Sequence, residues 1–159
     1  MKIGDKETCE IGQIIYEIVE GYYESYSNLR KKFVRWLYFS KIAQSVFIKS
    51  SKKRKHSNYP GDYQSDYVKG NGEDFVWGFN YTECGGVRFL KNQNSLELAP
   101  YLCISDYAMF RALGVGFKRT KTIAMNCDVC DFRLVKDYQT PKGWPPENLE
   151  EFQQYISKK

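Results

Sequence analysis

The stretch YQSDYVKGNGEDFVWGFNYTEC, residues 63–84, decides the fold. Asn71-Gly72 separates two segments with strand-like patterns, and an Asn-Gly pair is the strongest short signal for a β-hairpin because both positions tolerate positive φ. Aromatic side chains alternate along the second segment, which places them on one face of a strand. They are Phe75, Trp77, Phe79 and Tyr81. We therefore predict an antiparallel hairpin whose second strand ends at Glu83-Cys84.

A second hairpin is predicted from residues 114–125 and 129–137, with the tight connection NCD at residues 126–128. A helix over residues 99–113 precedes it. Pro100 suits the first turn of this helix because that position needs no backbone donor, and Gly114 suits its end. A shorter helix is predicted over residues 87–94.

The N-terminal region has apolar residues at helical spacing over residues 9–25 and again over 28–49, with Asn28 as the expected N-cap. Two antiparallel helices are predicted there. Near the C-terminal end, a Pro-rich segment precedes a short helix that starts near Glu147.

These elements predict an α+β fold in which two N-terminal helices pack on an antiparallel sheet built from two hairpins with an intervening helix. We expect residues 1–159 to form a single domain. It would comprise a helical hairpin (1–50), an α+β core (59–138) and a Pro-rich C-terminal segment with a short helix (139–159).

The composition is that of a globular protein, with 42% hydrophobic and 27% charged residues. No apolar run approaches the roughly 20 residues that span a bilayer, and residues 1–10 lack the apolar region of a secretory signal. We therefore expect a cytoplasmic protein with no membrane partner.

Five Lys or Arg residues and the one histidine lie in the run KSSKKRKH, Lys49–His56. Such a run can bind nucleic acid or anionic lipid. We favour a solvated loop that follows a helix, and so we do not expect nucleic acid as a partner.

Cys127 and Cys130 form a C-x-x-C pair, which raises the possibilities of a zinc site and a redox pair. A structural zinc site needs further ligands, and the one histidine lies in the distant basic run. The pair crosses a predicted turn between strands, where cysteines are often buried as small apolar residues. We therefore expect no metal and no cofactor.

Two other pairs combine a thiol with a carboxylate. Glu83-Cys84 ends the aromatic strand directly before two glycines, which would let a substrate approach the backbone. Cys103 and Asp106 are three residues apart in a predicted helix and so share one face. A carboxylate on a mostly buried face needs a partner or a function, and the alternative is that Asp106 faces water.

The strand predicted over residues 114–125 would place Arg119 and Lys121 on one face and Thr120 and Thr122 on the other. Such a strand could hold a small polar substrate with a carboxylate. The alternative is an exposed face with ordinary cross-strand ion pairs.

Together these motifs resemble the L-2-amino-thiazoline-4-carboxylic acid hydrolase family. Its members show a cysteine after a strand, then L-C-x-x-D, then R-T-x-T-[LI], and finally C-D-F-R. The corresponding elements here are Cys84, Leu102–Asp106, Arg119–Ile123 and Cys130–Arg133, within about residues 59–138. Family members often carry Gly-Asp in the turn where this chain has Asn126-Cys127, and Asn tolerates the same left-handed backbone. The resemblance thus implies that Cys127 is an extra thiol and that C-D-F-R is the meaningful unit.

The resemblance implies a hydrolase that opens a cyclic amidine-like ring at a C–N or C–S bond, with a small molecule as substrate. It implies Cys84 as nucleophile or substrate contact and Asp106 and Glu83 as acid/base groups, with Asp131 orienting one of them. The expected catalytic residues are Cys84, Asp106, Glu83 and Cys103. The expected substrate-binding residues are Arg119, Thr120, Thr122, Cys130, Asp131 and Arg133, with Arg119 and Arg133 for a substrate carboxylate.

The C-terminal strand is also similar to that of the 4-vinyl-reductase-like sensor domains, which close with a Gly-rich turn and a Cys-x-Phe strand. This likeness implies an alternative by fold-level analogy, a non-catalytic small-molecule-binding or sensor domain.

Overall fold

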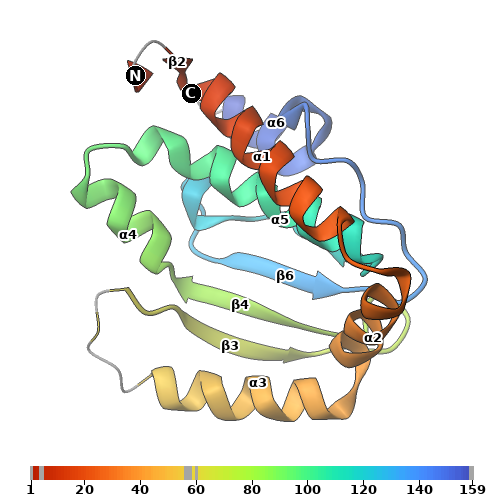
Figure 1. The fold of residues 1–159 in the computed structure, drawn as a ribbon. Coiled ribbons are helices and arrows are strands. Elements are labelled where there is room, and N and C mark those ends of the chain that lie inside the picture. The colour runs from red at the N-terminus through yellow and green to blue at the C-terminus, as the bar shows by residue number, and fades with distance from the viewer. Residues whose placement is uncertain (1, 4–5, 56–58, 60, 158–159) are drawn as a thin grey trace.

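The structure is a computed structural model that describes residues 2–3, 6–55, 59 and 61–157. It confirms the predicted α+β class: helices surround a four-stranded antiparallel sheet with the strand order β3-β4-β6-β5 (Figure 1). The strands are β3 (Gln64–Lys69), β4 (Trp77–Glu83), β5 (Phe117–Lys118) and β6 (Cys130–Leu134). A separate two-stranded sheet is formed by β1 (Lys2–Ile3) and β2 (Lys6–Glu7).

The α-helices are α1 (Thr8–Glu24), α2 (Asn28–Phe39), α3 (Lys41–Arg54), α4 (Gly85–Asn92), α5 (Ala99–Leu113) and α6 (Glu150–Ile156). Short 3₁₀ turns are η1 (Leu96–Leu98), η2 (Ile123–Met125) and η3 (Pro146–Asn148). Within the described residues, no helix has both the length and the apolar character that crossing a membrane requires.

The first predicted hairpin is present, but its loop is longer than a two-residue turn. Lys69 pairs with Trp77, so residues 70–76 form the connection. The Asn71 side-chain oxygen accepts hydrogen bonds from the backbone N–H groups of Glu73 (3.1 Å) and Asp74 (2.9 Å), and these bonds build a wider turn. Within it Gly72 has φ +87°.

The aromatic face of β4 packs into the core as predicted. Trp77 and Phe79 are buried, and Phe79 lies opposite Phe132 of β6 with the two rings stacked at 4.7 Å between centroids. Both rings of this stacked pair belong to the main hydrophobic core.

The strand predicted over residues 114–125 was largely wrong. Within residues 114–125, β5 is the one strand, and the range ends with the 3₁₀ turn η2. Between them the Asp131 carboxylate accepts hydrogen bonds from the backbone N–H groups of Thr120 (2.9 Å) and Lys121 (2.6 Å). It also accepts one from the Thr120 hydroxyl at 2.7 Å. Because a side chain satisfies these amides, the chain bends away from the sheet.

This bend also breaks the predicted alternation of faces. Arg119 and Thr122 are buried, whereas Thr120 and Lys121 are exposed. The left-handed turn predicted at Asn126 is present, with φ +62°.

The second predicted N-terminal helix is divided in two at Ser40. Its backbone is extended (φ −78°, ψ 152°), and its hydroxyl oxygen accepts from Ala43 N at 3.1 Å while donating to Leu37 O at 2.7 Å. Ser40 therefore closes α2 and caps α3. The N-cap of α2 is Ser27, which accepts from Arg30 N at 3.3 Å, and not Asn28 as predicted.

The basic run is mostly helical, because α3 extends to Arg54. The prediction of a loop was wrong for this part, and His56 lies outside the described residues. α3 runs along β3 at the edge of the sheet (Figure 1).

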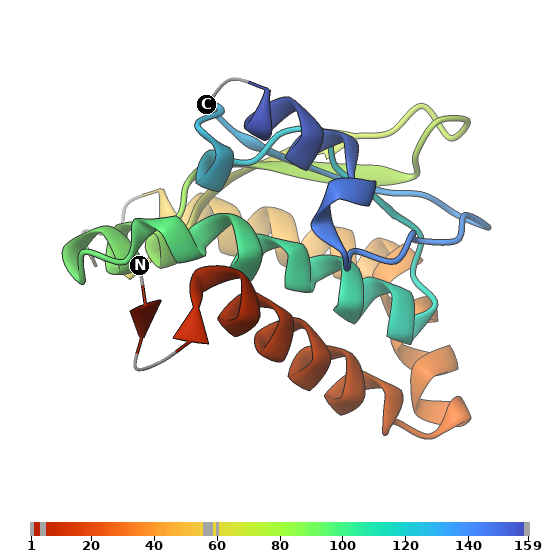
Figure 2. The ribbon, with the colours of Figure 1, turned by 90° about the horizontal axis from the view of Figure 1, so that it is seen from above.

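On the other side of the molecule, α5 covers the sheet and α1 packs along α5 (Figures 1 and 2). The two helices approach closely because Gly12 has no side chain: a Cβ there would lie 2.6 Å from the Cβ of Tyr101. As predicted, α5 has Pro100 in its first turn and ends at Gly114, whose φ is +67°. The space between α5, α3 and the sheet holds the candidate site.

Candidate active site

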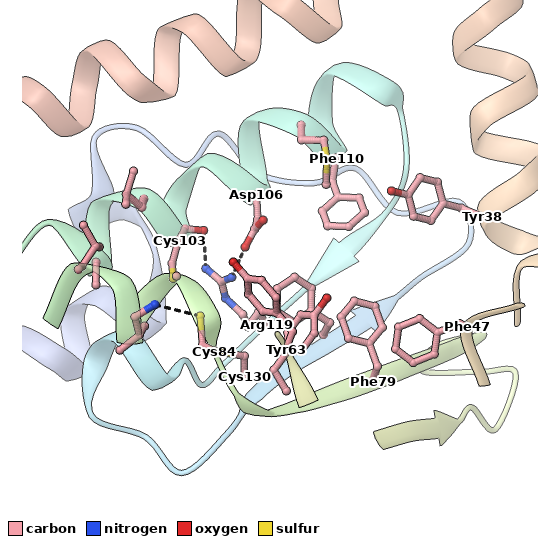
Figure 3. Close-up of a pocket in the computed structure, with 18 of the residues that line it drawn as sticks. Tyr38, Phe47, Tyr63, Phe79, Cys84, Cys103, Asp106, Phe110, Arg119 and Cys130 are labelled. Carbon is pink, nitrogen blue, oxygen red and sulfur yellow. Dashed lines mark hydrogen bonds and ion pairs between the residues drawn. The ribbon is translucent and has the colours of Figure 1, made fainter. Parts of the chain in front are cut away.

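A cavity of about 530 Å³ lies between α5 and the aromatic face of the sheet (Figure 3). Its size is typical of small-molecule sites. Aromatic side chains form the largest group among its lining residues. The aromatic lining residues are Tyr38, Phe47, Tyr63, Trp77, Phe79, Tyr81, Phe110 and Phe132.

Five of the predicted site residues line this cavity although they come from separate elements. They are Cys84, Cys103, Asp106, Arg119 and Cys130. Cys84 lies between β4 and α4, Cys103 and Asp106 lie in α5, Arg119 follows β5, and Cys130 begins β6. The structure thus gathers thiols, a carboxylate and a guanidinium in one apolar hollow.

Cys84 is the N-cap of α4, and its sulfur accepts a hydrogen bond from Val87 N at 3.4 Å. The adjacent Glu83 does not line the cavity, because its carboxylate pairs with Arg88 at 2.8 Å. Cys84 therefore faces the cavity, while the carboxylate of the adjacent Glu83 is turned to Arg88.

Arg119 is held by two carboxylates. Its Nε and Nη2 donate to Glu151 Oε2 (2.9 Å) and Oε1 (2.8 Å), and its Nη1 donates to Asp106 Oδ2 (2.6 Å). Nη2 also donates to the carbonyl oxygen of Cys103 at 2.9 Å. The Arg119 side chain is 0% exposed, so this arrangement fixes the guanidinium beneath the cavity surface.

Burial raises the pKa of Asp106, and the charge of Arg119 opposes this rise without cancelling it. Burial opposes the charge of Arg119, but Glu151 and Asp106 outweigh it and keep the pKa of Arg119 well above its ordinary value. The Asp106 side chain is 31% exposed, and it lines the cavity. A reachable carboxyl group with a raised pKa is suited to give and take protons.

A comparison with models of known protein families matched residues 6–134 to L-2-amino-thiazoline-4-carboxylic acid hydrolase. The chain belongs to this hydrolase family. Membership supports a hydrolase-like role at the level of the family. No match was found among curated proteins or among solved structures.

In this family member, two of the cavity thiols are held protonated. Burial raises the pKa of Cys103 to about 12 and also raises the pKa of Cys130. Thr122 donates to the sulfur of Cys103 at 3.6 Å, and Ile123 N donates to that of Cys130 at 3.2 Å. Thiols in this state are poor nucleophiles near neutral pH. Cys84 is therefore the best placed of the three to attack a substrate.

The remaining predicted site residues lie around the cavity and do not line it. Asp131 holds Thr120 in the bend after β5, Thr122 is fully buried, and Glu83 pairs with Arg88. Arg133 Nη1 donates to Asn80 Oδ1 and to Phe132 O, both at 2.9 Å. Their part in substrate binding or catalysis remains a prediction, and the positions found here give it no support.

The two cysteines of the C-x-x-C pair are directed to different places. Cys130 lines the cavity, whereas the Cys127 thiol is directed to the carbonyl oxygen of Met125 at 4.0 Å. Among the residues that the structure describes, no group of three or more His, Cys, Asp or Glu side chains is placed to hold a metal ion.

The sequence did not identify Glu151 or two of the cavity tyrosines, Tyr38 and Tyr63, as site residues. Glu151 lies in α6, beyond residue 134 where the family match ends. It shares α6 with the exposed Glu150, and nothing in the sequence separates the buried acid from the exposed one. Tyr81 was predicted on the aromatic face of β4, but Tyr38 and Tyr63 reach the cavity from α2 and from the segment before β3.

Proposed function

We propose that the protein hydrolyses a small cyclic amidine-like molecule in this cavity and opens its ring at a C–N or C–S bond. The observation that carries the proposal is that two reactive groups line one cavity. Cys84 presents its sulfur at the start of α4, and Asp106 presents a carboxyl group whose pKa is raised. A nucleophile and a proton-transfer group within one apolar cavity are what ring hydrolysis requires.

The proposed substrate is a ring whose amidine carbon is bonded to sulfur and two nitrogens. The Cys84 thiolate attacks that carbon, and the ring C–S bond breaks as Asp106 gives its proton to the departing sulfur. Asp106 then takes a proton from water, whose oxygen attacks the same carbon. The Cys84 sulfur leaves as a thiolate, and the product is an open-chain N-carbamoyl compound with a free thiol.

Turnover of 2-amino-2-thiazoline and of its 4-carboxylate by purified protein tests the proposal, with the ring-opened product measured by liquid chromatography. We expect Cys84→Ser and Asp106→Asn each to abolish turnover and to leave the circular dichroism spectrum unchanged. Cys9→Ser is the matched control, because Cys9 is exposed on α1 and does not line the cavity. Wild-type rates in both cavity variants would overturn the assignment.

A non-catalytic small-molecule-binding or sensor role is the second candidate, and the many aromatic side chains in the cavity wall favour it. It predicts that ring compounds bind to the wild-type protein and are recovered unchanged.

A further inference from the structure

The segment over residues 28–55, which forms α2, α3 and the C-cap of α3, carries a concentrated positive charge. It contains ten Lys or Arg residues and no Asp or Glu, whereas the remainder of the chain holds 14 basic and 19 acidic residues. Recorded ion pairs occupy two of the ten, Arg35 with Asp137 and Lys55 with Asp66. The net charge of +5 therefore comes from this one pair of helices, and the rest of the chain is acidic.

The outer face of α2 is apolar and exposed. Leu29, Phe33 and Trp36 follow one another at spacings of four and three residues, so they share one side of the helix. Their exposed fractions are 78%, 59% and 57%. The ring centroids of Phe33 and Trp36 are 5.9 Å apart, so the two rings form one continuous apolar surface. We call these three residues the α2 stripe.

The α2 stripe is not the face through which α2 packs in the fold. Val34 and Tyr38 lie on the opposite side of the helix and pack against the main core, and Tyr38 also lines the cavity. The helix therefore has an inner apolar face that stabilises the fold and an outer one that remains exposed. An exposed apolar surface bordered by charged residues is typical of a site that meets a partner.

The outer face of α3 combines the same two kinds of side chain. Ile42 and Val46 are each 61% exposed, and the exposed Lys49 and Lys53 follow them at helical spacing on the same side. Ser40 joins the two helices, so α3 begins beside α2 (Figure 1). The apolar and basic surface thus extends from one helix to the next.

A hollow of about 350 Å³ adjoins the α2 stripe and has basic walls. Lys32, Arg35 and Lys136 line it together with Trp36 of the stripe. Lys and Arg side chains grouped in this way are suited to bind a phosphate group. Tryptophan is enriched where the headgroup layer of a membrane meets its hydrocarbon, and Trp36 lies directly beside the three cations.

The chemistry of this surface distinguishes between possible partners. A second copy of the chain that bound through the same face would bring its ten basic residues against the first ten, which is unfavourable. Nucleic acid would neutralise the cations but offers no apolar layer to exposed aliphatic side chains such as Leu29, Ile42 and Val46. An anionic bilayer offers both negatively charged headgroups and hydrocarbon.

We propose that α2 and α3 dock the protein on an anionic lipid surface. The α2 stripe enters the boundary between headgroups and acyl chains, and the basic side chains around it bind headgroup phosphates. The expectation from the sequence that the membrane is no partner rested on the lack of a spanning segment, which surface docking does not require. The inference is independent of the proposed function, because it uses the outer faces of helices whose inner sides supply Tyr38 and Phe47 to the cavity.

Sedimentation of the purified protein with lipid vesicles tests the inference. One set of vesicles contains phosphatidylcholine alone, and the other contains phosphatidylcholine with about 30% phosphatidylglycerol. We expect the anionic vesicles to bind the protein at least about tenfold more tightly. Raising the NaCl concentration from about 0.1 M to about 0.5 M should weaken this binding by at least about fivefold. Equal binding to the two sets, or binding to neither, would overturn the inference.

Two variants locate the docking surface, and α4 offers a matched control for each. Phe33→Gln removes a ring from the α2 stripe, and Lys32→Glu reverses a charge beside it. Each should weaken binding to the anionic vesicles by at least about fivefold. Phe89→Gln and Lys91→Glu make the same changes at exposed positions of α4 and should alter binding by less than about twofold. Because all four positions are exposed, the circular dichroism spectra should stay unchanged. Variants of α2 that bind as well as their controls would contradict the assignment.

Two further measurements detect the other partners. Tighter binding of a duplex oligonucleotide than of the anionic vesicles, unchanged by Phe33→Gln, would assign the surface to nucleic acid and overturn the inference. A dimer in analytical ultracentrifugation that Phe33→Gln dissociates would assign the α2 stripe to a second copy of the chain and overturn it as well.

Discussion

At the scale of single residues, Asp106 occupies a position that conflicts with stability. Its carboxyl group is partly buried among aromatic rings, and one ion pair with Arg119 at 2.6 Å compensates this burial in part. The effect of burial is larger than that of the ion pair, because the pKa of Asp106 is raised and not lowered. A group that destabilises the folded state in its charged form and also faces a cavity is what a proton-transfer role requires.

This balance gives the protein a pH-dependent stability with a defined sign. The folded-state pKa of Asp106 lies above its ordinary value of 3.8, so the folded protein holds this proton more tightly than the unfolded chain. The stabilisation is complete at low pH and is lost as the pH rises from about 4 through the raised pKa. We expect the unfolding free energy of the wild type to fall relative to that of Asp106→Asn by about 1.4 kcal/mol per pH unit within this window.

Urea denaturation of both proteins at a series of pH values between about 4 and 8 measures this difference. A difference that stays constant across the series would show that Asp106 titrates normally in the folded protein.

At the scale of elements, local signals predicted most of the fold. Alternating aromatics identified β4, and Pro100 and Gly114 bounded α5. Two side chains account for the main errors in the predicted helices and strands, because each forms hydrogen bonds that compete with regular backbone pairing. Ser40 caps a new helix within a continuous helical pattern, and Asp131 binds backbone amides ten and eleven residues before it in the chain. Hydrogen bonds between separate segments, such as those of Asp131, depend on how the two segments pack together. A local sequence pattern carries no information about this packing.

The bend held by Asp131 also positions the charged cluster of Asp106, Arg119 and Glu151, because Arg119 directly precedes the bend in the chain. Asp131→Ala leaves the N–H groups of Thr120 and Lys121 without their acceptor. These N–H groups are partly exposed, which limits the loss of stability. We expect the unfolding free energy to fall by about 1–2 kcal/mol. Since Arg119 would lose its fixed backbone, we also expect ring-hydrolysis kcat to fall by about tenfold.

Urea denaturation and steady-state kinetics test these effects together. Asp128→Ala is the matched control, because Asp128 is an exposed acid in the neighbouring turn. An Asp131→Ala protein that matches this control in both measurements would refute the positioning role of the bend.

At the scale of the whole molecule, the site is built from segments distant in sequence. The thiols, Asp106 and Arg119 were predicted as site residues because their motifs together resemble those of the hydrolase family to which the chain belongs. Their contacts could not be predicted, since they depend on how α5, β6 and the C-terminal segment pack. Glu151 shows this most clearly: it comes from the far end of the chain and binds Arg119 through both of its oxygens.

The ion pair between Glu151 and Arg119 therefore connects α6 to the wall of the cavity. The two side chains are 1% and 0% exposed, and breaking such a pair leaves a buried guanidinium with half of its compensation. We expect Glu151→Gln to lower the unfolding free energy by about 3 kcal/mol, measured by urea denaturation at neutral pH. Glu150→Gln, at the exposed neighbouring position of α6, should change it by less than about 0.5 kcal/mol. Equal stability of the two variants would mean that α6 is held by its apolar contacts through Phe152 and Leu149, and that the cluster needs Asp106 alone to balance Arg119.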